Sequence, residues 1–426
     1  MLKLVFAGTP DVAVPSLKAF AADADKKSAD RFVPEVSDKT GKTVGIIGGG
    51  PAGLTAAYFL ALKGHTVTVL DQMPKMGGML RYGIPEYRLP KAVLDEEIAD
   101  IEALGVTLKN NFKIGKDASF EEIKSRYDAV IVAIGAWQSM GLRCEGADLS
   151  GVYGGIDFLE AVALGNPPKI GKSVAIVGGG NTAMDACRTA VRLGAENVYV
   201  VYRRTRAEMP AEDIEIEEAI EEGVEFKFLT NPDVILGENG HVTGIKLQVM
   251  ELGEPDESGR RSPVPVEGKF EELSVDTVIS ALGQRIKADG FDAVEKNQRG
   301  NIIADEATYK TNVDGVFAVG DATNRGAHIA ISAIGEAGRC ADICDAYLHG
   351  VDVYYEKPFV SERKTEDIDF TVYENRQRAK MPTRPADERK KDFGEVALGF
   401  TPEQARAEAA RCLECGCHDY GYCKLI

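Results

Sequence analysis

The chain has 426 residues, which allows two or three domains with substantial cores, and its 44% hydrophobic and 27% charged residues are ordinary for a globular protein. A formal net charge of −17 argues against nucleic acid as the main partner, because the phosphates would be repelled. No apolar stretch reaches the roughly 20 residues of a membrane-spanning helix. Residues 1–6 also lack the apolar region of a signal peptide, so we expect a cytoplasmic protein.

An internal repeat organises the chain. Residues 43–50 (TVGIIGGG) recur as residues 173–180 (SVAIVGGG), and an alanine-rich helix and a second apolar run follow each copy. Each copy predicts a strand, a glycine turn, a helix and a strand, which together make one βαβ unit. Both copies close with an apolar strand that ends in glycine, at 129–135 and 277–283. The repeat therefore predicts an α/β protein with two nested Rossmann-like nucleotide-binding domains, each three-layered around a parallel sheet.

The remaining elements set the expected domain boundaries. An apolar run at 315–320 leads into Asp321 and a helix-compatible stretch, which we interpret as the chain returning to complete the first domain. The expected units are an N-terminal helical or extended segment (1–39), the first nucleotide domain (40–140 and 290–350), the second nucleotide domain (141–289), an extended arm (351–400), and a C-terminal helix with a cysteine cluster (401–426).

The first glycine turn has the spacing of a dinucleotide fingerprint. Gly48 permits the tight turn, Gly50 lets the backbone approach a pyrophosphate, and Gly53 lets the helix pack on the strand. Amide groups at the helix N-terminus would then hold the phosphates. Asp71, at the end of the next strand, can accept hydrogen bonds from a ribose diol.

The second turn differs at one position. Gly178, Gly180 and Ala183 repeat the fingerprint, but arginines (Arg203, Arg204 and Arg206) follow the second strand, where the first copy has an acid. Guanidinium groups can bind a 2′-phosphate in a bidentate fashion, whereas a carboxylate would repel it. This pattern favours NADP(H) over NAD(H), and the alternative is a solvated basic cluster.

Two further motifs suggest redox chemistry. Gly320 and Asp321 follow a buried-looking strand, and the aspartate can accept from a sugar hydroxyl of the first nucleotide. At the C-terminus, Thr401, Pro402 and Gln404 predict the start of a helix that leads to four cysteines within twelve residues: Cys412, Cys415, Cys417 and Cys423. Four such thiolates predict an iron–sulfur cluster, most simply of the 4Fe–4S type, with zinc as the alternative.

These motifs resemble the glutamate synthase small-subunit family of FAD/NADP(H) oxidoreductases. The family includes the pyridine-nucleotide arm of dihydropyrimidine dehydrogenase and the NADPH-binding subunit of electron-bifurcating transhydrogenases. The stretches that carry the resemblance are LKAFAAD (17–23), RFVPEV (31–36), GGMLRYGIPEYRLPK (77–91), GGGNTAMDACR (178–188), YRRTRAEMPAE (202–212) and GVFAVGDA (315–322).

The resemblance implies two sets of cofactor-binding residues. The expected FAD contacts are Gly48, Gly50, Pro51, Ala52, Gly53, Asp71, Gln72, Gly78, Met79, Arg88, Gly135, Gly320, Asp321 and Ile329. Arg88 is expected to help neutralise the flavin pyrophosphate. The expected NADP(H) contacts are Gly178, Gly180, Asn181, Thr182, Ala183, Arg203, Arg204, Arg206, Ala281 and Gly283.

The expected activity is hydride exchange between NADP(H) and FAD, with no catalytic side chain required because the cofactors carry the chemistry. Electrons would then pass through the iron–sulfur cluster to another redox subunit or to ferredoxin, in a transhydrogenase or an electron-bifurcating complex. One alternative is a glutamate synthase small subunit that supplies electrons from NADPH. An alternative of another class is a non-catalytic assembly subunit that carries zinc.

Overall fold

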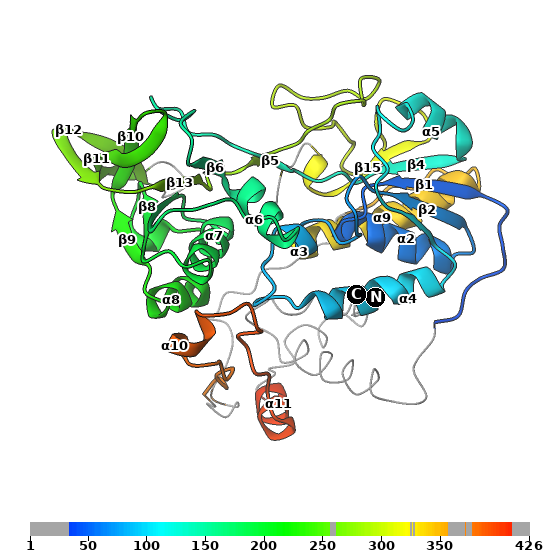
Figure 1. Ribbon diagram of the computed structural model, residues 1–426. Coiled ribbons are helices and arrows are strands. Elements are labelled where there is room, and N and C mark those ends of the chain that lie inside the picture. Colours follow the sequence, from blue (N-terminus) through cyan, green and yellow to red (C-terminus); the bar gives the residue numbers. More distant parts are fainter. Residues whose placement is uncertain are drawn as a thin grey trace.

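The computed structural model describes residues 34–255, 261–323, 326, 329–356, 371 and 377–410 (Figure 1). Most of the N-terminal segment expected over residues 1–39, and the cysteine cluster expected at 412–423, lie outside these residues. Within the described part, no helix combines the length and apolar character that crossing a bilayer requires.

The first domain is built on a five-stranded parallel sheet with the order β15-β4-β1-β2-β3. Its strands are β1 (Thr43–Ile47), β2 (Thr66–Leu70), β3 (Thr107–Lys109), β4 (Ala129–Val132) and β15 (Val316–Ala318). The first four come from one stretch of chain, whereas β15 joins them after the second domain. The central strands are continuous apolar runs because both faces of a parallel sheet are covered.

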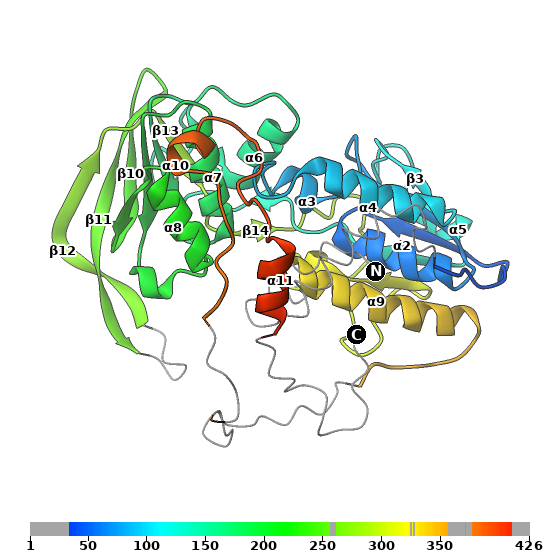
Figure 2. The same cartoon turned by 90° about the horizontal axis from the view of Figure 1, so that it is seen from below.

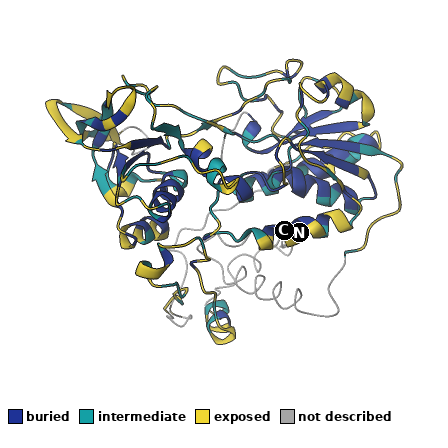
Figure 3. Cartoon of the chain, in the orientation of Figure 1, coloured by how far each residue is buried: buried dark blue, intermediate teal, exposed yellow. Residues whose placement is uncertain are grey.

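Helices cover both faces of this sheet (Figures 1 and 3). On one face lie α2 (Pro51–Leu62), α4 (Lys91–Ala103) and α9 (Ala330–Leu348), whose apolar side chains share a core with the sheet. Helix α5 (Phe120–Arg126) packs on the other face and begins with a capping box between Ser119 and Glu122. These three layers confirm the predicted architecture.

The second domain repeats the topology with a sheet of order β6-β13-β7-β8-β9, also all parallel. The strands are β6 (Val152–Gly154), β7 (Ser173–Val177), β8 (Asn197–Tyr202), β9 (Glu225–Phe228) and β13 (Thr277–Ser280). One face carries helices α6 (Gly155–Ala163), α7 (Asn181–Arg192) and α8 (Asp213–Glu221).

The other face of the second sheet carries an antiparallel sheet that the sequence pattern did not predict. Its strands are β10 (Thr230–Glu238), β11 (His241–Pro255) and β12 (Arg261–Leu273). Ile235, Ile245 and Leu247 pack from it against Ala175 and Val201 of the parallel sheet. This second sheet takes the place that a helix layer occupies in the first domain.

The two domains are joined where the chain crosses between them twice. Strands β5 (Gln138–Ser139) and β14 (Gln284–Arg285) belong to the two crossings and pair antiparallel. The short helix α3 (Met79–Tyr82) of the first domain also packs on α6 of the second. Two 3-10 turns, η2 (Arg206–Glu208) and η3 (Gly320–Ala322), follow β8 and β15 respectively.

The structure describes only part of the extended arm expected over residues 351–400. Residues 377–400 contain the short helix α10 (Ala386–Arg389) and lie against the junction of the two domains (Figure 2). Arg389 is only 2% exposed there. Helix α11 (Pro402–Ala409) begins as predicted, since the Thr401 hydroxyl accepts from the Gln404 amide and the Gln404 side chain accepts from the Thr401 amide.

Candidate functional site: two glycine turns on two parallel sheets

The first glycine turn lies between β1 and α2. A Cβ on Gly48 would overlap the carbonyl oxygen of Ala133, and a Cβ on Gly53 would overlap the carbonyl oxygen of Gly48. Gly48 also has φ of 109°, a value that side-chain-bearing residues rarely adopt. Gly50 is the N-cap of α2 and no side chain caps that helix, so its first amide groups are left for another acceptor. Uncapped helix N-termini that follow glycine turns are common phosphate-binding sites in proteins.

Asp71 directly follows β2 and lies beside the turn. It is 7% exposed, and its two carboxylate oxygens accept from the amides of Gly49 (2.5 Å) and Met73 (2.7 Å). Burial raises the pKa of Asp71, while the hydrogen bonds from the Met73 and Gly49 amides act in the opposite direction. Each oxygen retains an acceptor position, so a role toward a ribose diol stays a prediction.

Other predicted residues of the first site gather around the turn. Gly78, with φ of 53°, starts α3, and its Cα lies close to Gly50. Pro51 and Ala52 form the first positions of α2, and Met79 opens α3. Gly135 lies beyond β4 near Trp137, Gln72 is exposed next to Asp71, and Ile329 is the exposed N-cap of α9.

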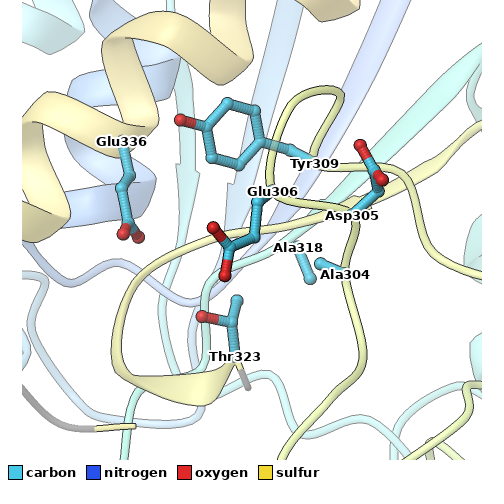
Figure 4. Close-up of a pocket in the computed structure, with 7 residues that line it drawn as sticks. All are labelled: Ala304, Asp305, Glu306, Tyr309, Ala318, Thr323 and Glu336. Carbon is cyan, nitrogen blue, oxygen red and sulfur yellow. The ribbon is translucent and has the colours of Figure 1, made fainter. Parts of the chain in front are cut away.

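Gly320 and Asp321 form η3 at the end of β15. Gly320 has φ of 72°, and its amide donates to Oε2 of the buried Glu336 over 3.1 Å. A small hollow lies beside this turn (Figure 4), lined by Ala304, Asp305, Glu306, Tyr309, Ala318, Thr323 and Glu336. Three carboxylates in its wall make this hollow unsuitable for a phosphate. The role of Glu336 was not anticipated, because a single glutamate inside a helical run carries no motif.

The second glycine turn reproduces the first. A Cβ on Gly178 would overlap the carbonyl oxygen of Ala281, and Gly180 is the N-cap of α7, again without a side-chain cap. Asn181 accepts from the Glu212 amide over 3.2 Å, and Thr182 and Ala183 continue the first turn of the helix. Ala281 and Gly283 lie just beyond β13, at the edge where β7 also ends.

The structure separates the three predicted arginines. Arg203 directly follows β8 and is exposed. Arg204 is 6% exposed, and its Nε donates to the carbonyl oxygen of Arg261 in β12 over 3.1 Å. Arg206 pairs with Glu217 over 3.2 Å and, less closely, with Asp213. Arg203 and Arg206 are thus both exposed, whereas Arg204 contacts the antiparallel sheet.

Arg88 lies between the domains. Its Nη1 donates to Oδ1 of Asp185 over 2.7 Å, and its Nε pairs with Oε1 of Glu215 over 2.9 Å. The opposing charges of Asp185 and Glu215 outweigh burial and raise the pKa of Arg88. The Arg88 guanidinium thus pairs with residues of the second domain. Its contact with a flavin pyrophosphate remains a prediction.

The metal prediction falls outside the described residues. Cys412, Cys415, Cys417 and Cys423 all lie beyond residue 410. In the part of the chain that the structure covers, no three His, Cys, Asp or Glu residues are grouped so that they could hold a metal ion. The iron–sulfur cluster and its zinc alternative therefore both stay predictions.

Comparison with known proteins places this geometry in a family. A family model described as pyridine nucleotide-disulphide oxidoreductase matches residues 42–337, which include both glycine turns and every strand from β1 to β15. The chain belongs to this family. The prediction that it is an oxidoreductase is thereby confirmed.

Relatives within this oxidoreductase family are similar over most of the chain. The beta subunit of NADP(+)-dependent formate dehydrogenase from Moorella thermoacetica is 43% identical, over 88% of this chain and 55% of that protein. The beta subunit of NADPH-Fe(3+) oxidoreductase from Geobacter sulfurreducens is 39% identical, over 88% of this chain and 61% of that protein. The chain thus spans little more than half the length of these two relatives.

The glutamate synthase [NADPH] small chain of Escherichia coli is 38% identical, over 75% of this chain and 71% of that protein. This confirms the family resemblance seen in the sequence. Among solved structures, Mycobacterium tuberculosis FprA in complex with NADPH has a TM-score of 0.63 at 21% identity, covering 72% of this chain and 85% of that one. Lactococcus lactis thioredoxin reductase has a TM-score of 0.56 at 21% identity, covering 73% and 100%. Both show the shared fold.

Proposed function

We propose that this oxidoreductase binds FAD at the first glycine turn and NADP(H) at the second, and exchanges hydride between them. The observation that carries the proposal is the duplicated turn. Gly48 and Gly178 each leave no room for a side chain, and each precedes a helix whose N-terminal amides have no side-chain cap. The two sites lie at the carboxyl ends of parallel strands, where α/β proteins bind nucleotides.

The chain's own residues would bind and orient the two cofactors. When bound, FAD and NADP(H) would supply the chemistry of hydride transfer between nicotinamide and flavin. Gly48 to Gly53 would hold one pyrophosphate, with Asp71 at the adjacent ribose and Gly320 and Asp321 at the ribityl side. Gly178 to Ala183 would hold the other pyrophosphate, and Arg203 would meet the 2′-phosphate.

Electron exit to a partner subunit is the second part of the proposal. The cysteines at 412–423 would hold an iron–sulfur cluster that takes electrons from the flavin side. Support comes from relatives named as beta subunits of a formate dehydrogenase and of an NADPH-Fe(3+) oxidoreductase. A ferredoxin-linked or bifurcating complex would use the same exit. The similarity to glutamate synthase small chains favours a second candidate, in which a separate amidotransferase receives the electrons.

An anaerobic visible spectrum of the purified protein, titrated separately with NADPH and NADH, tests the proposal. We expect flavin bands that NADPH bleaches at a concentration at least about tenfold lower than NADH, together with iron and a broad cluster absorbance. A protein that purifies without flavin and cannot be reconstituted with it would contradict the proposal. A flavin spectrum with zinc in place of iron would remove the cluster and leave the hydride exchange.

A further inference from the structure

Residues 84–90 of the first domain reach into the second domain. They lie between α3 and α4, and the ammonium of Lys91 fixes their shape by donating to the carbonyl oxygens of Leu80, Ile84 and Leu89. Tyr87 is fully buried, and its hydroxyl donates to the backbone carbonyl of Asp185 over 3.4 Å. With the ion pairs of Arg88 to α7 and α8, this segment is a polar contact between the domains.

Charged residues of α7 and of the end of α8 form the second-domain side of this contact. Arg188 and Arg192 both bind Glu222, whose side chain is completely buried. The guanidinium carbons of Arg188 and Arg192 lie 4.8 Å and 3.8 Å from the centre of the Tyr87 ring. Tyr87 therefore lies against two cations that a carboxylate holds in place, an arrangement that favours an aromatic ring.

The C-terminal arm closes over the same cluster. Arg389 of α10 pairs with Glu222 over 3.0 Å and with Glu221 over 2.8 Å. Arg192 donates to the carbonyl oxygen of Asp392 over 3.0 Å. The Val396 amide then donates to the carbonyl oxygen of Tyr87, in the first domain, over 2.9 Å. The arm is thus bonded to both domains at one place (Figure 2).

The arm segment has a defined shape of its own. Its two ends are held together because the Arg384 amide donates to the Val396 carbonyl oxygen over 3.0 Å and the Leu398 amide donates to the Pro382 carbonyl oxygen over 2.8 Å. A bidentate pair between Arg384 and Asp392, at 2.7 Å for each bond, braces the loop between them. We call residues 382–398 the clasp.

We propose that the clasp, acting through Arg389 and together with Tyr87 and Arg88, holds the second domain in one orientation against the first, so that hydride exchange requires no domain rotation. Arg389 and Arg88 are then positioning residues for the reaction. The consequence for hydride exchange rests on the proposed function. The fixed orientation of the domains is inferred from the contacts alone.

The other links described between the domains are short elements. Strands β5 and β14 are two residues long, and α3 has four residues. Relative movement is the default expectation for two domains unless their interface is large and hydrophobic. Rotation would break the pairs of Arg88, uncover Tyr87 and remove the Val396 hydrogen bond together. Since a small misplacement of reacting groups lowers rate steeply, a fixed orientation has a catalytic use.

The test compares Arg389→Ala with Lys390→Ala. Lys390 is the adjacent residue, the C-cap of α10, and its ion pair is with the exposed Asp387 three residues earlier. Both variants remove one positive charge, but only the first removes a contact between the clasp and the second domain. Arg389→Ala is expected to fold, because Glu222 retains Arg188 and Arg192 and because the Glu221 side chain is 58% exposed.

The first readout is amide hydrogen exchange, which requires no turnover. In Arg389→Ala we expect the Val396 amide to exchange at least about tenfold faster than in the wild-type chain, while amides of the β7 core keep their protection. Small-angle scattering should show a broader distribution of interdomain distances. Lys390→Ala should match the wild type in both, and Arg389→Lys should restore part of the protection because it keeps the charge.

The second readout separates this inference from the proposed function. With the flavin-loaded protein, Arg389→Ala should slow reduction at saturating NADPH by about tenfold or more while the affinity for NADPH stays unchanged. An unchanged exchange rate of the Val396 amide, or equal effects of the two alanine variants, would contradict the proposed role of the clasp, whatever the effect on activity. Absence of flavin binding in the wild-type chain would instead overturn the proposed function and leave the exchange result valid.

Discussion

The residues that follow the second strand differ between the two glycine turns, and the register aligns Asp71 with Tyr202, one residue before Arg203. Asp71 is the first residue after β2, and Arg203 is the first residue after β8, so both lie at the end of the strand next to their glycine turn. Asp71 is buried and accepts from the turn, whereas Arg203 is exposed. A carboxylate at this place suits a ribose diol and an arginine suits a ribose phosphate. We therefore expect Asp71 and Arg203 to contribute to nucleotide specificity in their respective domains.

Replacing Arg203 by serine should weaken NADPH binding by about 10- to 100-fold, the loss expected for one or two charge-assisted hydrogen bonds. The affinity for NADH should change little, because NADH lacks the 2′-phosphate. Titration of the flavin bands or of nucleotide fluorescence measures both constants. Arg204→Ser serves as the comparison, since Arg204 is buried against β12 and should alter thermal stability more than nucleotide preference. Equal losses for both nucleotides in Arg203→Ser would contradict the assignment.

Glu222 makes the junction sensitive to acid. Burial alone would raise its pKa, but hydrogen bonds from Arg192 and Arg188 outweigh that effect and hold the pKa at about 2, below the ordinary value of 4.5. The folded chain therefore binds this proton more weakly than the unfolded chain. The stabilisation is complete above about pH 4.5 and is lost as the pH falls toward 2. Asp185 contributes with the opposite sign, because burial raises its pKa despite the opposing effect of Arg88.

Because the whole chain carries many carboxylates, the contribution of Glu222 is isolated by comparing the wild-type chain with Glu222→Gln. Between about pH 5 and pH 3, the thermal midpoint of the wild type should fall further than that of the variant. The additional loss of unfolding free energy in the wild type should be at most about 3 kcal/mol. At pH 5 the variant should be less stable by a few kcal/mol, because three arginines lose their shared carboxylate. Parallel pH profiles would show that Glu222 titrates normally.

At the scale of elements, the two turn–helix units are similar but not interchangeable. Helix α2 approaches β1 so closely that a Cβ on Gly53 would overlap the carbonyl oxygen of Gly48. The matching position in the second copy is Ala183, a fully buried core residue in the first turn of α7. The first helix thus requires glycine and the second accepts a methyl group.

Gly53→Ala should therefore push α2 away from β1 and the glycine turn. We expect a loss of stability of about 2 kcal/mol, since overpacking of a tight contact typically costs 1–3 kcal/mol, and reduced retention of flavin. Gly141→Ala is a suitable control, because a Cβ at Gly141 would meet nothing within 4 Å. Chemical denaturation and the flavin content after gel filtration measure the two effects. Equal behaviour of the two variants would show that α2 can shift without consequence.

At the scale of the whole molecule, several contacts link the two similar domains, among them the pairs of Arg88 with Asp185 and Glu215. The crossings pair as β5 and β14, α3 packs on α6, and the clasp binds both domains at Tyr87 and Glu222. The clasp is followed directly by α11, which leads toward the cysteines at 412–423. The chain therefore runs from the clasp, which contacts both domains, through α11 to the cysteine segment. This gives the arm a structural role that a surface linker would not have.

The duplicated α/β fold, the two glycine turns and the start of α11 are predictable from the amino-acid sequence. These features are local, since each depends on residues within one βαβ unit or one helical turn, where hydrophobic period and glycine spacing carry the information. Three features depend on the folded chain: Arg88 pairs with Asp185 and Glu215, Arg204 contacts β12 while Arg203 is exposed, and β10 to β12 cover the second sheet. Those contacts join residues far apart in the chain, and a charged or polar side chain carries no local sign of which distant partner it will meet.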